Sequence, residues 1–258
     1  MAALVLPVQA DDLPWQSALN GSNRSVENKA RDNYRHPQQT LQFFGISAGM
    51  TVVEIAPGGG WYSEILAPLL QDNGRYYAAH YSANGPGGYY RKSLGGYLQK
   101  LGENPGAYKS VIVTTLQPPE EVTIAPAGSA DLVVAFRNVH SWLRADSGDQ
   151  TLSAIYTALK PGGTFGVVQH RAKAGVDIES MKKSGYVTER QMMDMAEAAG
   201  FVLAGSSQIN ANPKDTADYA EGVWTLPPSL RLKDKDREKY IAIGESDRMT
   251  LKFIKPQS

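Results

Sequence analysis

Apolar residues follow two patterns along this chain, and together the patterns predict a sheet covered by helices. Segments with helical periodicity, such as the one ending near Gln71 and the one at 149–159, alternate with short apolar or β-branched runs. The run DLVVAF has no polar positions after its first residue, which is typical of a strand buried on both faces. This alternation favours an α/β fold, with a three-layer, doubly wound, mostly parallel seven-stranded sheet. The expected strands lie at 51–54, 75–79, 110–115, 131–136, 164–168, 202–209 and 248–254.

The stretch from Thr51 to Leu70, TVVEIAPGGGWYSEILAPLL, has the order strand, carboxylate, glycine turn and helix. The first turn of a helix leaves backbone N–H groups unpaired, and glycines let a ligand approach them closely. We therefore expect a ligand cradle in which Glu54 accepts hydrogen bonds from ribose hydroxyls or a ligand amine. A dinucleotide-binding turn would need a third glycine where Ser63 stands, and a phosphate-binding loop would need a lysine that this stretch lacks.

Polar residues also follow the other expected strands. His80 follows the second strand, Arg137, Asn138 and His140 follow the fourth, and His170 follows the fifth. Because open parallel sheets bind ligands outside the carboxyl ends of their strands, we expect these side chains to meet at one site. For His140 the alternative is a helix start that packs against the sheet. Metal-ligand spacings, cysteine ligands and the G-x-S-x-G nucleophile elbow are missing, so neither a metal centre nor a serine hydrolase is expected.

Two further segments flank or interrupt the sheet. Residues 11–45 are expected to form a helical cap, and 46–258 the main domain with an insertion at 210–247. The cap carries four residues at helical spacing, namely Arg24, Asn28, Arg31 and Arg35. They form either a solvated helix face or a cap over the ligand edge. The insertion leaves from the carboxyl end of the sixth strand, so it should overhang the ligand as a wall or lid.

Composition narrows the partners and suggests a location. The 258 residues carry a formal net charge of +0 with a pI near 6.9, which gives no reason to expect nucleic acid or an anionic membrane as a partner. No cysteine is present, and no run approaches the roughly 18 apolar residues of a membrane span. Residues 1–10, MAALVLPVQA, have the apolar run and small-x-small ending of a clipped signal peptide, which predicts an exported, periplasmic protein. The alternative is an apolar N-terminal arm on a cytoplasmic protein.

Several segments resemble one superfamily. EIAPGGG, which contains Glu54, Ala56, Gly58, Gly59 and Gly60, resembles the first motif of class I S-adenosylmethionine-dependent methyltransferases. SADLVVAFRNVHSW is similar to their fourth-strand motif, LKPGGTFGVV to the turn into their fifth strand, and AEAAGFVLAGSSQI to their closing helix and sixth strand. NKARDNYRHPQQTLQFFG, INANPKDT and GESDRMTLKF resemble a family of exported bacterial proteins described as predicted methyltransferases.

The resemblance implies S-adenosylmethionine as cofactor and assigns residues to it. Glu54, Ala56 and the turn at 58–60 would hold its amino acid end, and the end of the second strand, at His80, would hold its ribose. The sequence departs from the superfamily at two positions. His80 stands where a ribose-binding Asp or Glu is usual, and a neutral imidazole offers at most one acceptor. After the third strand, where an acidic residue near the adenine is common, the chain reads Thr114-Thr115-Leu116.

Methyl transfer mainly requires positioning, and a base is needed only for an acceptor that begins protonated. We expect His140 to be that base, with Arg137 and Asn138 orienting a small or medium-sized acceptor. The expected substrate contacts are Tyr89, His170 and Trp224.

Two other functions remain open from the sequence. The first is an exported protein that keeps the fold and pocket but binds another small ligand without methyl transfer, which the two missing carboxylates and the export signal favour. The second is a nicotinamide-dependent oxidoreductase, which Ser63 and the position of Glu54 disfavour, because that carboxylate would lie near the pyrophosphate.

Overall fold

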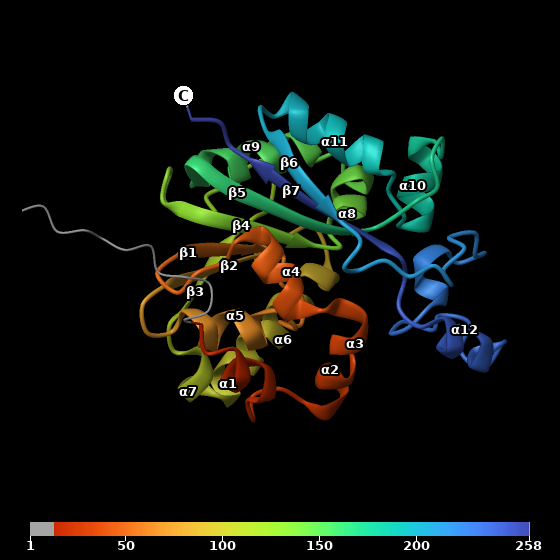
Figure 1. Cartoon of the computed structure of the whole chain (residues 1–258), viewed down its shortest axis with the longest axis horizontal. Coiled ribbons are helices and arrows are strands. Elements are labelled where there is room, and N and C mark those ends of the chain that lie inside the picture. The colour runs from red at the N-terminus through yellow and green to blue at the C-terminus, as the bar shows by residue number, and fades with distance from the viewer. Residues whose placement is uncertain (1–12, 258) are drawn as a thin grey trace, which may run out of the picture.

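The computed structural model describes residues 13–257, and within them a seven-stranded sheet lies between two layers of helices (Figure 1). The strand order is β3-β2-β1-β4-β5-β7-β6; β1 to β5 run parallel, and β7 is antiparallel to both β5 and β6. The predicted three-layer, mostly parallel fold is therefore confirmed. The expected signal segment at 1–10 lies outside the described residues. The strands are β1 Thr51–Ile55, β2 Arg75–His80, β3 Val111–Thr115, β4 Ala130–Phe136, β5 Leu159–His170, β6 Val202–Ser207 and β7 Arg248–Ile254.

Helices cover both faces of this sheet. On one face lie α1 Trp15–Asn20, α4 Pro37–Phe44, α5 Ser63–Leu70, α6 Gly88–Glu103 and α7 Pro105–Tyr108, with α2 Val26–Ala30 and α3 Asp32–Arg35 beside them. On the other face lie α8 Val139–Arg144, α9 Gly148–Ala158, α10 Ile178–Ser184 and α11 Glu189–Ala198. The segment between β6 and β7 contains η2 Gly222–Thr225 and α12 Arg237–Ile243.

The central strands are buried on both faces because neighbouring side chains enter different cores. Val53 and Val133 pack with the α8, α9 and α11 layer, whereas Val52 and Val134 pack with α5 and α4. Successive strand residues point to opposite faces, so a sheet covered on both sides needs apolar residues at consecutive positions. This is the physical reason for the unbroken apolar run that predicted β4.

The N-terminal segment is a chain of short helices rather than one continuous run. Gly21 ends α1, and Ser25 caps α2 by accepting a hydrogen bond from the backbone N–H of Asn28 at 3.1 Å. His36 has a left-handed backbone with φ of +39° and separates α3 from Pro37, the first residue of α4. Proline at the first helical position is favourable because its missing N–H would have no helical partner there.

Two glycine-containing stretches adjoin or enter regular structure. The stretch at 84–88 leads directly into α6, which begins at Gly88 and contains the tyrosines that follow. The turn expected at 160–163 belongs to β5 instead. Gly162 N–H donates to Lys255 O at 2.8 Å and Lys255 N–H donates to Gly163 O at 3.0 Å, so this stretch pairs with the chain that follows β7.

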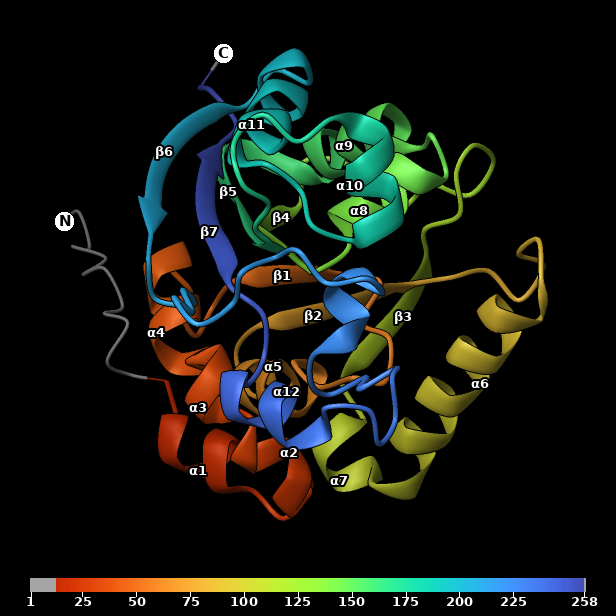
Figure 2. The ribbon, with the colours of Figure 1, turned by 90° about the vertical axis from the view of Figure 1, so that its right-hand side faces the viewer.

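The segment at 210–247 lies in front of the strands, between α10 and the N-terminal helices (Figure 2). Its residues Val223 and Trp224 line the cavity described below. Among residues 13–257, none of the helices has the length and apolar character needed to cross a membrane.

Candidate functional site

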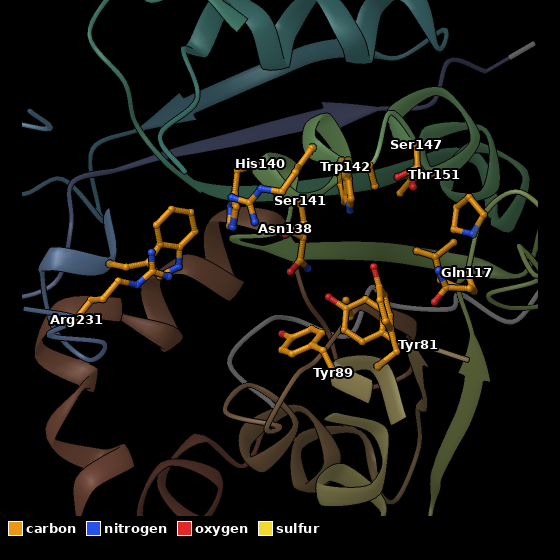
Figure 3. Close-up of a pocket in the computed structure, with 17 residues that line it drawn as sticks. Tyr81, Tyr89, Gln117, Asn138, His140, Ser141, Trp142, Ser147, Thr151 and Arg231 are labelled. Carbon is orange, nitrogen blue, oxygen red and sulfur yellow. The ribbon is translucent and has the colours of Figure 1, made fainter. Parts of the chain in front are cut away.

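Two adjoining cavities of about 530 and 400 Å³ lie at the carboxyl ends of the parallel strands. The larger, called here the β3-side cavity, extends to Leu116 and Gln117 after β3, and the smaller, the arginine-side cavity, extends to Arg137 and Arg248. Figure 3 shows the larger one, with Tyr81 and Tyr89 opposite the α8 residues. Because seven residues line both, the cavities form one site; these are Ala56, Tyr81, Tyr89, Asn138, His140, Ser141 and Trp224.

The glycine turn between β1 and α5 leaves space in front of the backbone. A Cβ added at Gly58 or Gly59 would meet no atom within 4 Å, and both residues line the arginine-side cavity. Gly58 has φ of +59°, a conformation that favours glycine. Gly60 differs, because a Cβ there would come within 3.0 Å of the Tyr97 ring. Gly60 thus permits packing against α6, and the ligand-facing glycines are Gly58 and Gly59.

Glu54 lies beneath this turn and is 2% exposed. Its Oε2 accepts hydrogen bonds from Ser63 Oγ at 3.0 Å and from the Tyr76 hydroxyl, whereas no donor within residues 13–257 reaches Oε1. Burial raises the pKa of Glu54 to about 7, and the bonds from Tyr76 and Ser63 only partly oppose that rise. Since Glu54 lines the arginine-side cavity, Oε1 remains available to a ligand cation.

His80 has a supporting role that the sequence did not indicate. Tyr81 N–H donates to its Nδ1 at 2.7 Å, so in the neutral ring Nε2 carries the proton and donates to Gly58 O at 3.2 Å. Burial lowers the pKa of His80, which favours this neutral form. Both ring nitrogens therefore hold the backbone of the strand end and the glycine turn. These contacts argue against the expected ribose-binding role of His80, because both ring nitrogens already have backbone partners. Tyr81 is the residue of this strand end that lines the cavity.

Asn138 joins the end of β4 to β1. Its Nδ2 donates to Ile55 O at 2.6 Å, and the residue lines both cavities. Next to it, Arg137 has a left-handed backbone with φ of +63°, as does Ala56 with φ of +44°. Left-handed backbone in residues other than glycine is unfavourable and clusters at functional sites. Both outliers lie where β1 and β4 separate, which is the usual ligand position in a doubly wound sheet.

His140 directs a donor, not a base, toward the cavity. The Gln169 side chain lies 3.0 Å from Gly185 O, which can only accept, so the amide nitrogen must face that oxygen. The same nitrogen lies 3.3 Å from His140 Nδ1, which therefore accepts and leaves the proton on Nε2. Burial, assisted by the nearby Arg144 charge, lowers the pKa of His140 to about 4. Proton position and low basicity both argue against the expectation that His140 acts as a general base.

The other expected substrate contacts also line the site. Trp224 in η2 faces the His140 ring at a centroid distance of 5.8 Å and has the Arg231 guanidinium 4.6 Å from its own ring. His170 Nδ1 lies 2.5 Å from Ser246 Oγ, and burial holds the pKa of His170 well below its usual range. Tyr89, at the start of α6, is 69% exposed and lines both cavities.

Two of the N-terminal arginines are buried and a third is partly buried, which argues against the interpretation of a solvated helix face. Arg24 and Arg35 are 3% and 2% exposed, and their guanidinium carbons lie 5.2 and 4.6 Å from the Trp61 ring centre. Arg31 and Arg35 donate to Glu245 at 2.6 and 3.0 Å. Both of these arginines line the arginine-side cavity.

Several lining residues were not indicated by the sequence patterns, among them Tyr81, Gln117, Glu245 and Arg248. The first two directly follow strand ends, so the rule applied to β4 and β5 could have found them. Glu245 and Arg248 have no such signal, because Glu245 meets Arg35 across 210 residues of sequence and Arg248 meets Tyr34 O across 214. Within the described part of the chain, no group of three or more His, Cys, Asp or Glu side chains could hold a metal ion.

Comparison with known proteins identifies the fold. No protein-family model and no curated protein sequence matches the chain. A SAM-dependent methyltransferase from Aquifex aeolicus superposes with a TM-score of 0.58 at 16% identity, over 88% of this chain and 93% of that one. Phosphoethanolamine N-methyltransferase 2 of Haemonchus contortus, solved with S-adenosyl-L-methionine, gives 0.55 at 16%, over 94% and 60%. The cyclase SpnF gives 0.59 at 17%, over 93% and 86%. The chain therefore has the class I methyltransferase fold.

Proposed function

We propose that this protein is an S-adenosylmethionine-dependent methyltransferase that acts on a small-molecule acceptor. The observation that carries the proposal is the open glycine turn above a buried carboxylate with one unpaired oxygen. A ligand with a cationic amine and a carboxylate suits this pair of features, because Glu54 faces the cation and helix-start N–H groups favour the anion.

The rest of the site fits the same cofactor. Gln117 Oε1 is buried with no hydrogen-bond partner among the described residues, and it borders the β3-side cavity. An unpaired buried acceptor costs about 1–3 kcal/mol, which the exocyclic amine of an adenine would relieve. Tyr81 and Leu116 supply flat and apolar walls beside it. At the end of β3, Gln117 would thus accept a hydrogen bond from the adenine, in the place where an acidic residue is common elsewhere in the superfamily.

The chain's own residues would position the reactants. When bound, S-adenosylmethionine supplies an electrophilic methyl group on a sulfonium. Asn138, tied to β1 through its amide nitrogen, keeps its position where the two cavities meet. His140 Nε2–H donates toward the acceptor, and Trp224 closes the wall that excludes water. Because His140 is a donor, we expect an acceptor whose nucleophilic atom already has an available lone pair.

Calorimetric titration with S-adenosylmethionine and S-adenosylhomocysteine tests the proposal. The wild-type protein should bind both, and Gly59→Val should abolish binding because the added side chain enters the open space in front of the turn. Gly49→Val is the matched control, since a Cβ at Gly49 also meets no atom within 4 Å and Gly49 does not line either cavity. Absence of wild-type binding at millimolar ligand would show that the proposed function is wrong and leave a methyltransferase fold with another ligand.

A further inference from the structure

Positive charge is concentrated in the arginine-side cavity of a chain whose formal net charge is zero. Four guanidinium groups border it, and the carboxylates that border it are Glu54 and Glu245; the guanidinium groups belong to Arg31, Arg35, Arg137 and Arg248. Burial holds much of the Glu54 population protonated near neutral pH, because its pKa is raised to about 7. Glu245 is thus the main counter-charge to four arginines.

The four arginines do not share this counter-charge equally. Glu245 Oε1 accepts from Arg31 Nε at 2.6 Å, and Glu245 Oε2 accepts from Arg35 Nε at 3.0 Å and from Arg248 Nη2. Arg137 makes no side-chain hydrogen bond or ion pair with any residue in 13–257. Arg35 Nη1 and Arg248 Nε are also buried without a partner among those residues.

The neighbouring charges and the burial of Arg137 change its pKa. Burial, followed by the repulsion of Arg248, lowers the pKa of Arg137 to about 10, and the attraction of Glu245 does not reverse the shift. Its left-handed backbone adds roughly 1–3 kcal/mol of strain. A half-buried guanidinium that is strained, unpaired and surrounded by other arginines is unfavourable for stability alone, which is the signature of a group kept for a ligand.

We propose that Arg137 binds an oxyanion group, a carboxylate or a phosphate, of the methyl acceptor in the arginine-side cavity. The acceptor assignment rests on the proposed function. The cofactor would bring two cationic groups and one carboxylate. Its binding would therefore increase the net positive charge of the site even if its carboxylate paired with an arginine. An anionic acceptor removes that surplus, and a planar guanidinium suits carboxylate and phosphate equally through paired N–H donors.

The position of Arg137 agrees with this assignment. It follows β4, and its charged neighbours come from the β7 side of the sheet and from the N-terminal helices. Gln117 follows β3, at the opposite end of the strand order. The two regions meet at Ala56 and Asn138, where the transferred group would lie between cofactor and acceptor.

Titration of the full-length protein with inorganic phosphate, and separately with acetate, tests the oxyanion site. We expect at least one of the two to bind to the free protein and to the protein saturated with S-adenosylhomocysteine. Arg137→Gln should weaken that binding about tenfold or more, because hydrogen bonds to charged groups are worth that much. Arg137→Lys, which retains the charge but not the planar fork, should weaken it less. Arg190→Gln is the matched control, since Arg190 is exposed and pairs with Asp194 on α11.

Each other outcome identifies which idea fails. If neither anion binds, or if Arg137→Gln binds the anion as well as the wild type does, the oxyanion site is wrong. If S-adenosylhomocysteine displaces the anion and Arg137→Gln weakens S-adenosylhomocysteine instead, the arginine serves the cofactor carboxylate and the acceptor assignment is overturned. If S-adenosylhomocysteine does not bind while Arg137-dependent phosphate binding persists, the proposed methyltransferase function fails and the oxyanion site stands.

Discussion

At the scale of single residues, the environment of a side chain decides its chemistry more than its type does. Glu54 and Glu245 are both buried carboxylates on the same cavity, 2% exposed each. Burial raises the pKa of Glu54 although Arg137 lies near enough to oppose the rise, whereas four arginines lower the pKa of Glu245 despite its burial. Glu54 can therefore bind a ligand cation, whereas Glu245 is already paired with arginines of the protein.

Glu54 should make cofactor affinity depend on pH. A ligand ammonium group binds the ionised carboxylate, so affinity for S-adenosylhomocysteine should rise as pH increases through about 7. Below that value, each decrease of one pH unit should weaken binding about tenfold. Glu54→Gln should remove this dependence and weaken binding at high pH. Calorimetry across the range measures both effects. A wild-type affinity that does not change with pH would contradict the raised pKa.

The raised pKa of Glu54 should have the opposite pH effect on the stability of the ligand-free protein. The folded state holds the Glu54 proton more strongly than the unfolded chain, so the contribution of this residue to the free energy of unfolding should fall as pH rises from about 4.5 to about 7. Binding of a ligand cation would compensate for that loss. The wild type and Glu54→Gln should therefore differ in the slope of unfolding free energy against pH over this window.

His140 should titrate far below a free imidazole. We expect a midpoint near pH 4 when its ring proton shifts are followed by NMR, with His140→Gln identifying the resonance. Because the folded pKa is depressed from 6.5, the unfolded chain binds the proton more readily, and stability should be lost as pH falls from about 6.5 to about 4. A midpoint near 6.5 would restore His140 as a candidate base.

At the scale of elements, the N-terminal helices are joined to the loop before β7 by one carboxylate. Glu245 accepts from Arg31 and Arg35 on one side and from Arg248 on the other. Asn210 adds a second link, since its Nδ2 donates to both Thr40 Oγ1 and Thr250 Oγ1 at 3.0 Å. These contacts fix the cap over the arginine-side cavity, so the cap helps to build the site.

Glu245→Gln should destabilise the fold strongly. Removing the carboxylate charge leaves the buried guanidinium groups of Arg35 and Arg248 and the partly buried one of Arg31 without compensation. Breaking a buried pair costs about 3–5 kcal/mol. Denaturant unfolding followed by circular dichroism measures the loss. Asp194→Asn is the matched control, because it removes an exposed i,i+4 partner of Arg190 and should change stability by less than about 1 kcal/mol. Equal effects of the two substitutions would show that Glu245 is not structurally required.

At the scale of the whole molecule, the two cavities lie between parts of the chain that are distant in sequence. The strand ends, α8, the N-terminal helices and the 210–247 segment all supply lining residues. A ligand there binds the folded chain and not the unfolded one, so it should stabilise the whole protein.

S-adenosylhomocysteine at about a hundred times its dissociation constant should stabilise the protein by about 2.7 kcal/mol. For a chain of 258 residues, this corresponds to an increase in Tm of about 5–10 °C. Differential scanning calorimetry gives the shift directly. Gly59→Val should unfold near the wild-type temperature without ligand and show no increase with it. An increase of similar size in Gly59→Val would mean that the ligand binds elsewhere.

The sequence alone determined the three-layer fold, the positions of the strands along the chain and the glycine cradle. The apolar run of β4 and the glycines at 58–60 are local patterns. Local patterns arise because backbone geometry and burial act over a few residues, so they are readable in order along the chain.

Only the tertiary structure decided the chemistry of the site. The partner of His80 Nε2–H is Gly58 O, the His140 tautomer depends on Gly185 through Gln169, and the charge of buried Arg35 is balanced by Glu245. Each of these partners lies at least 22 residues away in sequence from the group that it controls, or reaches it through a third residue. Protonation and charge balance depend on three-dimensional neighbours and on burial, and no spacing in the sequence encodes either.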